Sequence, residues 1–153
     1  MTTDASQRRG IIARAIAELI EQLWHATSNR GFATGLNPAQ WTALRYLDRV
    51  NEGVRSVGAF AEFHRTTPSS ASQTFSALVK RGLVAKEKGA DSRQRMLTLT
   101  RAGREILKQD PLDHLADAIT KLPDRQLTSL TEIMERLARA TSADEKAKSK
   151  KST

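Results

Sequence analysis

The chain has 153 residues, a net charge of +8 and no cysteine. This length suits one domain with its own core and is short for a two-domain enzyme. Without cysteine, disulfides, thiolate metal sites and thiol redox switches are excluded. No apolar run approaches membrane-spanning length, and the first ten residues lack the apolar core of a secretory signal, so we expect a soluble, cytoplasmic protein.

The positive charge is concentrated in the middle of the sequence. Residues 45–104 hold 12 Lys and Arg against 5 Asp and Glu, whereas residues 10–44 are neutral and residues 105–140 have a net charge of −2. A localised positive field favours a polyanionic partner. Taken alone, the charge is explained equally well by a solvated basic surface that serves solubility.

Two helices are expected in the first third of the chain. Residues 10–27 place apolar side chains in pairs every four residues, which predicts a long helix with a narrow apolar stripe. Asn37 or Pro38 begins a second helix, with Trp41 among its apolar positions. The polar residues 1–9 are expected to form a flexible N-terminus.

Two short elements follow, and a helix with a hydroxyl-rich start comes after them. Residues 54–56 could form a short strand, and Ser56 can cap a brief helix. In the run "TTPSSAS", Thr67 is a suitable N-cap and Pro68 a suitable first residue for the next helix, which Gly82 ends.

This helix has an apolar and a polar face. At about 100° per residue, Ala71, Phe75 and Leu78 lie together, opposite small polar side chains. Such side chains let a helix backbone approach base edges in a major groove, and the first turn favours a phosphate. A solvent-exposed helix with a Ser-rich start explains the face equally well. The predicted DNA-binding residues of this segment are Thr67, Ser69, Ser70, Ser72, Gln73, Ser76 and Lys80.

A basic hairpin is predicted next, because the strand-like runs "LVAKEK" and "RQRMLTLT" are separated by "GADS". Lys86, Lys88, Arg93 and Arg95 lie on or beside its tip, where an Arg can enter the narrow minor groove. Asp91 could orient Arg93 or merely form an exposed ion pair of little energetic value. Helix, turn, polar-faced helix and basic hairpin follow one another in the order of a winged helix-turn-helix.

The rest of the chain is predicted to be helical up to a polar tail. A helix begins near Arg101 and must be interrupted or kinked at Pro111, and another covers residues 123–140. The Lys-rich residues 141–153 are expected to be disordered. The first and last helices have apolar stripes and little net charge, which suits a surface buried by a partner, although packing within one chain would produce the same stripes.

The order of these motifs resembles the MarR family of dimeric transcription regulators, over about residues 10–140. The resemblance rests on "LNPAQWTALRYL", "SALVKRGLVAKE" and "DSRQRMLTLTRAG". In the third segment, Asp91 and Arg93 match the Asp and the second Arg of the family's wing pattern, and Gly103 matches its last position. Ser92 departs from the family's usual first Arg, which puts one wing contact in doubt.

The resemblance implies a mainly α protein with a small β-hairpin wing. Residues 38–100 would form the winged helix-turn-helix lobe, and residues 10–35 and 101–140 the helices of a homodimer. It also implies a small-molecule pocket where the two parts meet. Trp24, His25, Trp41 and Arg45 would border the pocket, which could hold an aromatic acid with its carboxylate on Arg45. Core packing is the commoner role for both tryptophans.

Enzyme functions are disfavoured, since His25, His64 and His114 are isolated from one another and no nucleophile-and-base or phosphate-binding motif is present. We expect no catalytic residue, cofactor or metal site. The sequence therefore predicts a ligand-responsive repressor that binds a pseudo-palindromic operator in double-stranded DNA. The alternative is a winged-helix module that binds proteins and never contacts DNA.

Overall fold

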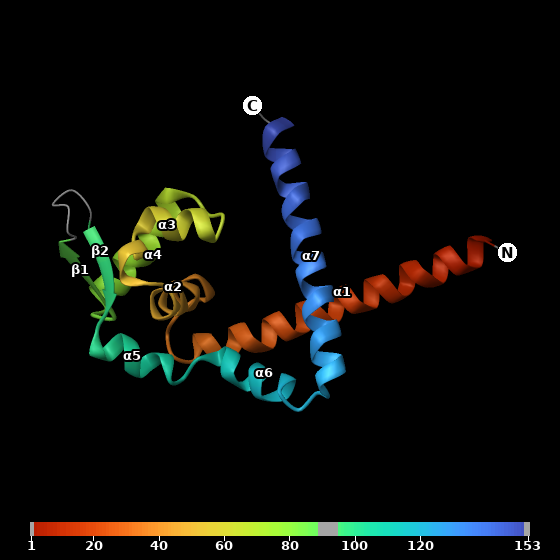
Figure 1. Cartoon of the computed structure of the whole chain (residues 1–153), viewed down its shortest axis with the longest axis horizontal. Coiled ribbons are helices and arrows are strands. Elements are labelled where there is room, and N and C mark those ends of the chain that lie inside the picture. The colour runs from red at the N-terminus through yellow and green to blue at the C-terminus, as the bar shows by residue number, and fades with distance from the viewer. Residues whose placement is uncertain (1, 89–94, 152–153) are drawn as a thin grey trace. The chain divides into compact units, whose positions relative to one another are not determined.

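The computed structural model of the protein describes residues 2–88 and 95–151 (Figure 1). It is mainly helical, with one antiparallel two-stranded sheet, so the predicted fold class is confirmed. The elements are α1 (Thr2–Phe32), α2 (Pro38–Arg49), the 3-10 helix η1 (Glu52–Val54), α3 (Val57–Phe63), α4 (Pro68–Lys80), β1 (Val84–Lys88), β2 (Arg95–Leu99), α5 (Arg101–Leu107), α6 (Pro111–Ile119) and α7 (Asp124–Lys151).

The chain forms two compact units, residues 1–111 and residues 112–153, where the sequence predicted one domain over 10–140. The boundary falls at the predicted interruption. α5 ends at Leu107, and Pro111 is the first residue of α6, a position at which the missing N–H of proline costs nothing. The first unit contains α1, the winged-helix elements and α5, and the second contains most of α6 and all of α7.

Both terminal helices are longer than predicted. α1 begins at Thr2, before the predicted start at residue 10, and the expected flexibility of residues 1–9 stays a prediction. α7 continues to Lys151, beyond the predicted end at residue 140, and the expected disorder of residues 141–153 stays a prediction. The predictions ended each helix where its apolar stripe ended. However, these segments are rich in Ala, Lys, Arg and Gln, which propagate a helix that has already been nucleated.

Local signals determine α2. Asn37 and Gln40 form a capping box, in which the Asn37 side chain accepts from the Gln40 N–H at 2.9 Å and the Gln40 side chain accepts from the Asn37 N–H at 3.0 Å. Its reciprocal hydrogen bonds satisfy two N–H groups that the helix itself leaves unpaired. The predicted start of this helix is therefore confirmed.

The segment between α2 and α3 differs from the prediction. The short strand predicted for residues 54–56 is wrong, because η1 occupies Glu52–Val54. One strand-like hydrogen bond remains, from the N–H of Leu97 in β2 to the Arg55 carbonyl at 2.8 Å. Ser56 then caps α3 as predicted, accepting from the N–H of Ala59 at 3.1 Å.

α4 begins and ends as its sequence predicts. The Thr67 side chain accepts from the Ser70 N–H at 3.1 Å, and Pro68 is the first helical residue. At the other end, Gly82 adopts a φ of 70°, a conformation that costs glycine little. The N–H groups of Gly82 and Leu83 donate to the carbonyls of Val79 and Leu78 at 2.9 and 3.0 Å, which is the Schellman pattern.

The hairpin that follows α4 contributes buried side chains to the core. β1 and β2 are antiparallel, with Val84 opposite Leu99 and Lys86 opposite Leu97. Side chains alternate along a strand, so these four share one face of the hairpin; Val84, Leu97 and Leu99 are buried in the core, while Lys86, nearer the tip, is exposed. The wing is thus anchored by apolar residues at its base, next to the end of α4.

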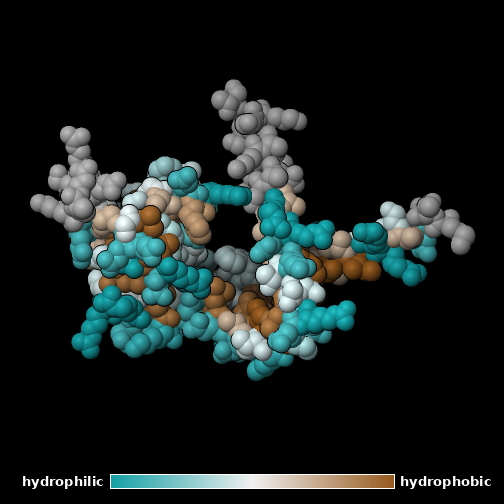
Figure 2. Space-filling view, in the orientation of Figure 1, coloured by the Kyte–Doolittle hydropathy of each residue, from teal (hydrophilic) through white to brown (hydrophobic). Residues whose placement is uncertain are grey.

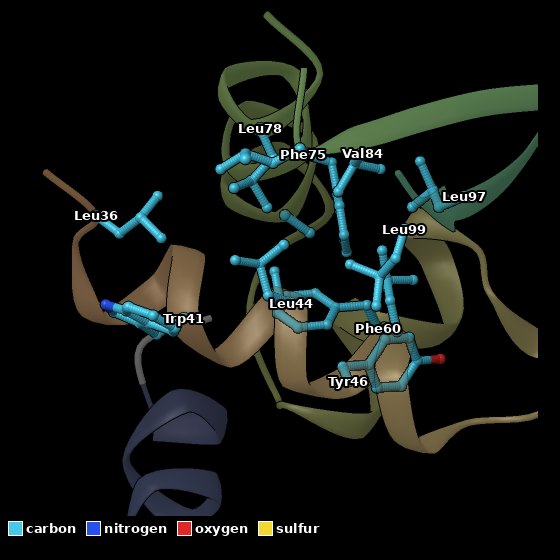
Figure 3. Packing of buried hydrophobic residues seen from close by; sticks show 14 of the residues in the cluster. Leu36, Trp41, Leu44, Tyr46, Phe60, Phe75, Leu78, Val84, Leu97 and Leu99 are labelled. Carbon is cyan, nitrogen blue, oxygen red and sulfur yellow. The ribbon is translucent and has the colours of Figure 1, made fainter. Parts of the chain in front are cut away.

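The buried core lies within residues 36–99 (Figure 3). Aromatic rings form its centre: Phe60 meets Tyr46 and Phe75 edge to face, with ring centroids 5.2 and 5.0 Å apart. The buried apolar residues are Leu36, Trp41, Ala43, Leu44, Tyr46, Leu47, Phe60, Ala61, Ala71, Phe75, Leu78, Leu83, Val84, Leu97 and Leu99.

Candidate nucleic-acid interface

α4 presents one polar face to solvent while its other face fills the core. Ala71, Phe75 and Leu78 are buried, as the helical phase predicted. The predicted DNA-binding residues of this segment are all exposed, and the spacing of most places them on one side of the helix. They are Thr67, Ser69, Ser70, Ser72, Gln73, Ser76 and Lys80. The partly buried Thr74 differs, because its hydroxyl donates to the Ser70 carbonyl at 3.0 Å.

The first turn of α4 is an ordered hydroxyl cluster. Besides capping the helix, the Thr67 hydroxyl donates to the Ser70 hydroxyl oxygen at 2.8 Å. Helix N-termini carry N–H groups without intrahelical partners and the positive end of the helix dipole. This turn therefore suits a phosphate oxygen, and the rest of the polar face suits base edges.

Hydrogen bonds connect the C-terminal end of α4 to two other segments of the chain. The Arg81 guanidinium donates to the carbonyl of Gly35 and, at 3.4 Å, to that of Thr34, both in the loop after α1. The Thr100 hydroxyl donates to the Gly82 carbonyl at 2.7 Å, from the residue that caps α5. The sequence analysis predicted neither contact. The sequence shows only that Arg81 follows a helix and that Thr100 follows a strand, and neither fact indicates the partner.

The base of the wing is closed by a close backbone approach at Gly103. A Cβ at this position would lie 2.1 Å from the Leu83 carbonyl oxygen, which no side chain tolerates. The same carbonyl accepts from the Thr100 N–H at 3.1 Å, and the Thr100 hydroxyl accepts from the Gly103 N–H at 3.0 Å. The glycine at the end of the wing motif is needed so that α5 can pack on the chain between α4 and β1.

The wing is only partly described. Lys86 is exposed on β1, and its neighbour Glu87 accepts from the Thr98 hydroxyl at 3.1 Å. Lys88 and Arg95 are paired by their backbones at the ends of the strands. Asp91 and Arg93, like the side chains of Lys88 and Arg95, lie outside the described residues. The contacts predicted for these four side chains therefore stay predictions.

Several basic residues of the lobe bind other parts of the protein. Arg55 donates to the Val50 carbonyl at 3.1 Å, and Arg104 donates to the Leu99 carbonyl at 2.8 Å. Arg45 forms an ion pair with Asp110, as described below. Counting charges along the sequence therefore overstates how many guanidinium groups face a polyanion, although the unneutralised ones still contribute to a positive field.

Two of the four predicted effector residues lie together. Trp41 is 1% exposed and donates from Nε1 to the Gly31 carbonyl at 3.4 Å, so its core role is confirmed. The Arg45 guanidinium lies 5.8 Å from the centroid of the Trp41 ring. It also donates to both carboxylate oxygens of Asp110, at 2.5 and 2.6 Å, with side chains only 16% and 9% exposed. Asp110 thus already binds the guanidinium that was expected to receive a ligand carboxylate.

The other two predicted effector residues, Trp24 and His25, lie on the surface of α1. Trp24 is 56% exposed in the single chain, so the expectation of a core residue is wrong for it. His25 is also exposed, with Nε2 3.9 Å from Glu21 one helical turn earlier. Both tryptophans occupy apolar helix positions in the sequence, but only Trp41 has elements packed against it.

A cluster of rings on the lobe was not singled out by the sequence. His64 contacts the rings of Phe60, Phe63 and Tyr46, with centroids 4.5, 5.0 and 5.8 Å away. Partial burial lowers the pKa of His64 and raises that of Tyr46, whose hydroxyl donates to the Val54 carbonyl at 2.9 Å. His64 follows α3 in chain order, so no helical pattern indicated these contacts.

Each unit also exposes apolar side chains along a long helix. Figure 2 shows the apolar side chains that α1 leaves on the surface. Such contiguous patches are typical of surfaces that a partner covers. The α1 residues are Ile11, Ile12, Ile16, Leu19, Ile20, Leu23 and Trp24, and those of α7 are Ile133, Met134 and Leu137.

Comparison with known proteins identifies the lobe. A model of the MarR family matches residues 34–95. The resemblance to the MarR family is confirmed. The matched segment runs from the loop before α2 to the first residue of β2 and contains all the buried core residues except Leu97 and Leu99. Among curated proteins, none matches the chain.

Solved structures share this MarR fold over most of the chain. MarR of Staphylococcus aureus in complex with salicylate and kanamycin is 18% identical, with a TM-score of 0.70 and coverage of 90% of this chain and 94% of that one. AbsC, a MarR family transcriptional regulator from Streptomyces coelicolor, is 20% identical, with a TM-score of 0.71 and coverage of 88% and 94%. Another regulator from Streptomyces coelicolor, solved in complex with DNA, is 23% identical, with a TM-score of 0.70 and coverage of 86% of each chain.

Two further findings concern the described part of the MarR-like chain. No helix there combines the length and apolarity needed to cross a membrane. Nor does any group of three or more His, Cys, Asp and Glu side chains within those residues lie close enough to hold a metal ion.

Proposed function

We propose that the protein is a homodimeric transcription regulator that binds a pseudo-palindromic operator, most simply as a ligand-responsive repressor. The observation that carries the proposal is the polar face of α4, which has no role in the core and exposes Ser69, Gln73, Ser76 and Lys80 together. A helix of this kind fits a major groove. The structural neighbour solved with DNA supports the same use of the fold.

Each side chain of the face has a chemical task in this proposal. Gln73 can pair bidentately with an adenine, and Ser69 and Ser76 can reach several bases. Ser70, in the first turn, and Lys80, in the last, would contact phosphates and set the register of the helix. Arg93 of the wing would enter the minor groove beside the site, where the potential is most negative.

The proposed dimer uses the apolar side chains that each chain exposes. Leu19 and Leu23 of α1 and Leu137 of α7 belong to stripes that a single chain leaves in water. Burying them against a second copy removes apolar area from water. Two recognition helices can meet successive major grooves only if the dimer holds them about 34–36 Å apart, so half-site centres should lie roughly 10 base pairs apart.

The proposed ligand response centres on Trp41 and Arg45. The S. aureus MarR structure contains salicylate, an aromatic acid, and Trp41 and Arg45 lie together in this chain. A ligand must compete with Asp110 for Arg45 and change DNA affinity through its differential affinity for two conformations. Aromatic acids can be screened by Trp fluorescence, and each hit repeated in an operator titration.

Selection of bound fragments from genomic DNA, followed by a random library built on the recovered site, tests the central claim. Gln73→Ala should relax the preference at one symmetric pair of positions and hardly alter non-specific affinity. Gln126→Ala, an exposed Gln of α7, is the matched control. A Gln73→Ala preference identical to wild type removes the residue from the site. A folded wild-type protein that recovers no DNA would favour the protein-interaction module.

A further inference from the structure

Arg81 connects two segments that are remote in sequence. It follows the last residue of α4 and lies 46 residues after Gly35 and 47 after Thr34, the two residues whose carbonyls its guanidinium binds. α4 carries the proposed recognition face, and α1 carries the apolar stripe proposed for the dimer. The contact is therefore a direct link between the part that would read DNA and the part that would hold the partner.

The loop after α1 is shaped to receive this side chain. Thr34 and Gly35 donate their N–H groups back to the carbonyls of Gly31 and Phe32, at 3.2 and 2.8 Å, which orders the loop at the end of the helix. Gly35 has a φ of 75°, and a Cβ there would lie 3.4 Å from Nη2 of Arg81. The C-terminal end of a helix carries partial negative charge, which further favours a cation.

A second hydrogen bond reaches the same helix end from another segment. Gly82, the residue after Arg81, accepts through its carbonyl from the Thr100 hydroxyl at 2.7 Å. The end of α4 thus has one contact to the loop after α1 and one to the residue that caps α5. Both residues are exposed, but the guanidinium of Arg81 donates to protein carbonyls, whereas Lys80 belongs to the polar face.

We propose that Arg81 is a positioning residue, which holds the recognition helix at one orientation relative to α1. Its consequence for DNA rests on the proposed function: the separation of the two α1 helices in a dimer would then fix the separation of the two α4 helices. A recognition helix without this link would still carry its contacts with bases, but it would accept half-sites at several spacings.

The first experiment measures orientation without DNA. Because the chain has no cysteine, Asn29→Cys and Ser76→Cys introduce two exposed labelling sites, one on α1 and one on α4. Spin labels there should give a single narrow distance distribution in the full-length protein, once labelled chains are mixed with an excess of unlabelled protein so that distances between the two chains of a dimer do not contribute. We expect Arg81→Ala to broaden or shift it and Lys80→Ala to leave it unchanged. An unchanged distribution in Arg81→Ala would overturn the proposal.

A second variant separates positioning from folding. Arg81→Lys keeps the charge but not the planar fork that reaches two carbonyls, so it should also broaden the distribution, while thermal unfolding reports whether each variant is folded. If Arg81→Ala does not fold, Arg81→Lys carries the test with the same criterion. A folded Arg81→Lys with the wild-type distribution would then reject the proposal.

The second experiment uses DNA and a library of half-sites with varied spacers. Arg81→Ala should accept a wider range of spacings with an unchanged salt dependence of affinity. Lys80→Ala should keep the wild-type spacing and lower the salt slope by about one, as expected for one lost phosphate contact. The reverse pattern for Arg81→Ala would show a direct phosphate contact and overturn the proposal. If wild type selects no DNA, the proposed function fails, and the label distances still decide the role of Arg81.

Discussion

Leu44 and Ile11 are both apolar residues on the apolar face of a helix, yet Leu44 of α2 is fully buried and Ile11 of α1 is 65% exposed. The difference extends to their surroundings. The lobe of residues 36–99 brings three helices and a hairpin around one set of aromatic and aliphatic side chains (Figure 3). Most of α1, in contrast, keeps its apolar stripe in contact with water.

The contrast separates two sources of stability. Burial in the lobe is complete within one chain, so the free energy of unfolding of the lobe should not depend on protein concentration. The stripe on α1 can contribute only when something covers it, and a second copy would make that contribution depend on concentration.

The largest effect is expected in the centre of the lobe. Phe75→Ala removes a buried ring that packs edge to face on Phe60, and should lower the free energy of unfolding by about 3–5 kcal/mol. Urea unfolding followed by circular dichroism measures it. Ser76→Ala, the exposed neighbour, should stay within about 0.5 kcal/mol of wild type. A loss below about 1 kcal/mol for Phe75→Ala would contradict the core described here.

A substitution in the apolar stripe of α1 should weaken dimer formation and leave folding of the single chain unchanged. Leu19 is 58% exposed in one chain. If a second copy covers it, Leu19→Ser should weaken the dimer by roughly 3 kcal/mol, since each of two copies loses about 1.5 kcal/mol of apolar burial. Light scattering over a range of concentrations measures the dissociation constant, with the exposed Gln22→Ala as control. Equal dissociation constants for Leu19→Ser and wild type would place the interface elsewhere.

A substitution at Gly103 tests how closely α5 packs on the backbone of Leu83. Gly103→Ala places a Cβ 2.1 Å from the Leu83 carbonyl oxygen, so α5 or the chain before β1 must move, at a cost of about 1–3 kcal/mol. Gly58→Ala in α3 is the matched control, because its Cβ would meet no atom within 4 Å. It should be neutral or slightly stabilising. Thermal unfolding of both variants gives the comparison, and equal stabilities would refute the close approach.

The smallest expected effect concerns pH. Burial lowers the pKa of His64 below 6.5, so the unfolded chain takes up this proton first as the pH falls. The contribution of neutral His64 to stability is therefore complete above about pH 6.5 and is lost as the pH falls toward the lower pKa of the folded state. His64→Gln should show a shallower loss of stability on acidification than wild type. His25→Gln is the control, and identical pH profiles for His64→Gln and wild type would exclude this contribution.

Local signals explain why much of the lobe could be predicted. The start of α4 depends on Thr67, Pro68 and Ser70, and its end depends on Gly82, all within one or two turns of the residues they affect. The shared buried face of Leu97 and Leu99, two residues apart on β2, likewise follows from strand geometry. In such cases the sequence contains both partners of the interaction side by side.

Contacts between distant residues could not be predicted in this way. Arg45 and Asp110 are 65 residues apart, and Arg81 and Gly35 are 46 apart, so no periodicity relates them. Their pairing depends on how α2, α4 and the loops pack. Trp24 and Trp41 illustrate the same limit: both fit apolar helix positions, but only Trp41 has the backbone of Gly31 against it.

The hydroxyl cluster at the start of α4 has a consequence for the thermodynamics of binding. The Ser70 hydroxyl is already held by Thr67 at 2.8 Å in the free protein, although Ser70 is exposed. A side chain that is ordered before the ligand arrives loses little conformational entropy on binding. The entropy cost of ordering the Ser70 side chain has already been incurred when the protein folds. Association at this turn should therefore show a less unfavourable entropy change than a contact made by a long, unrestrained side chain such as Lys80.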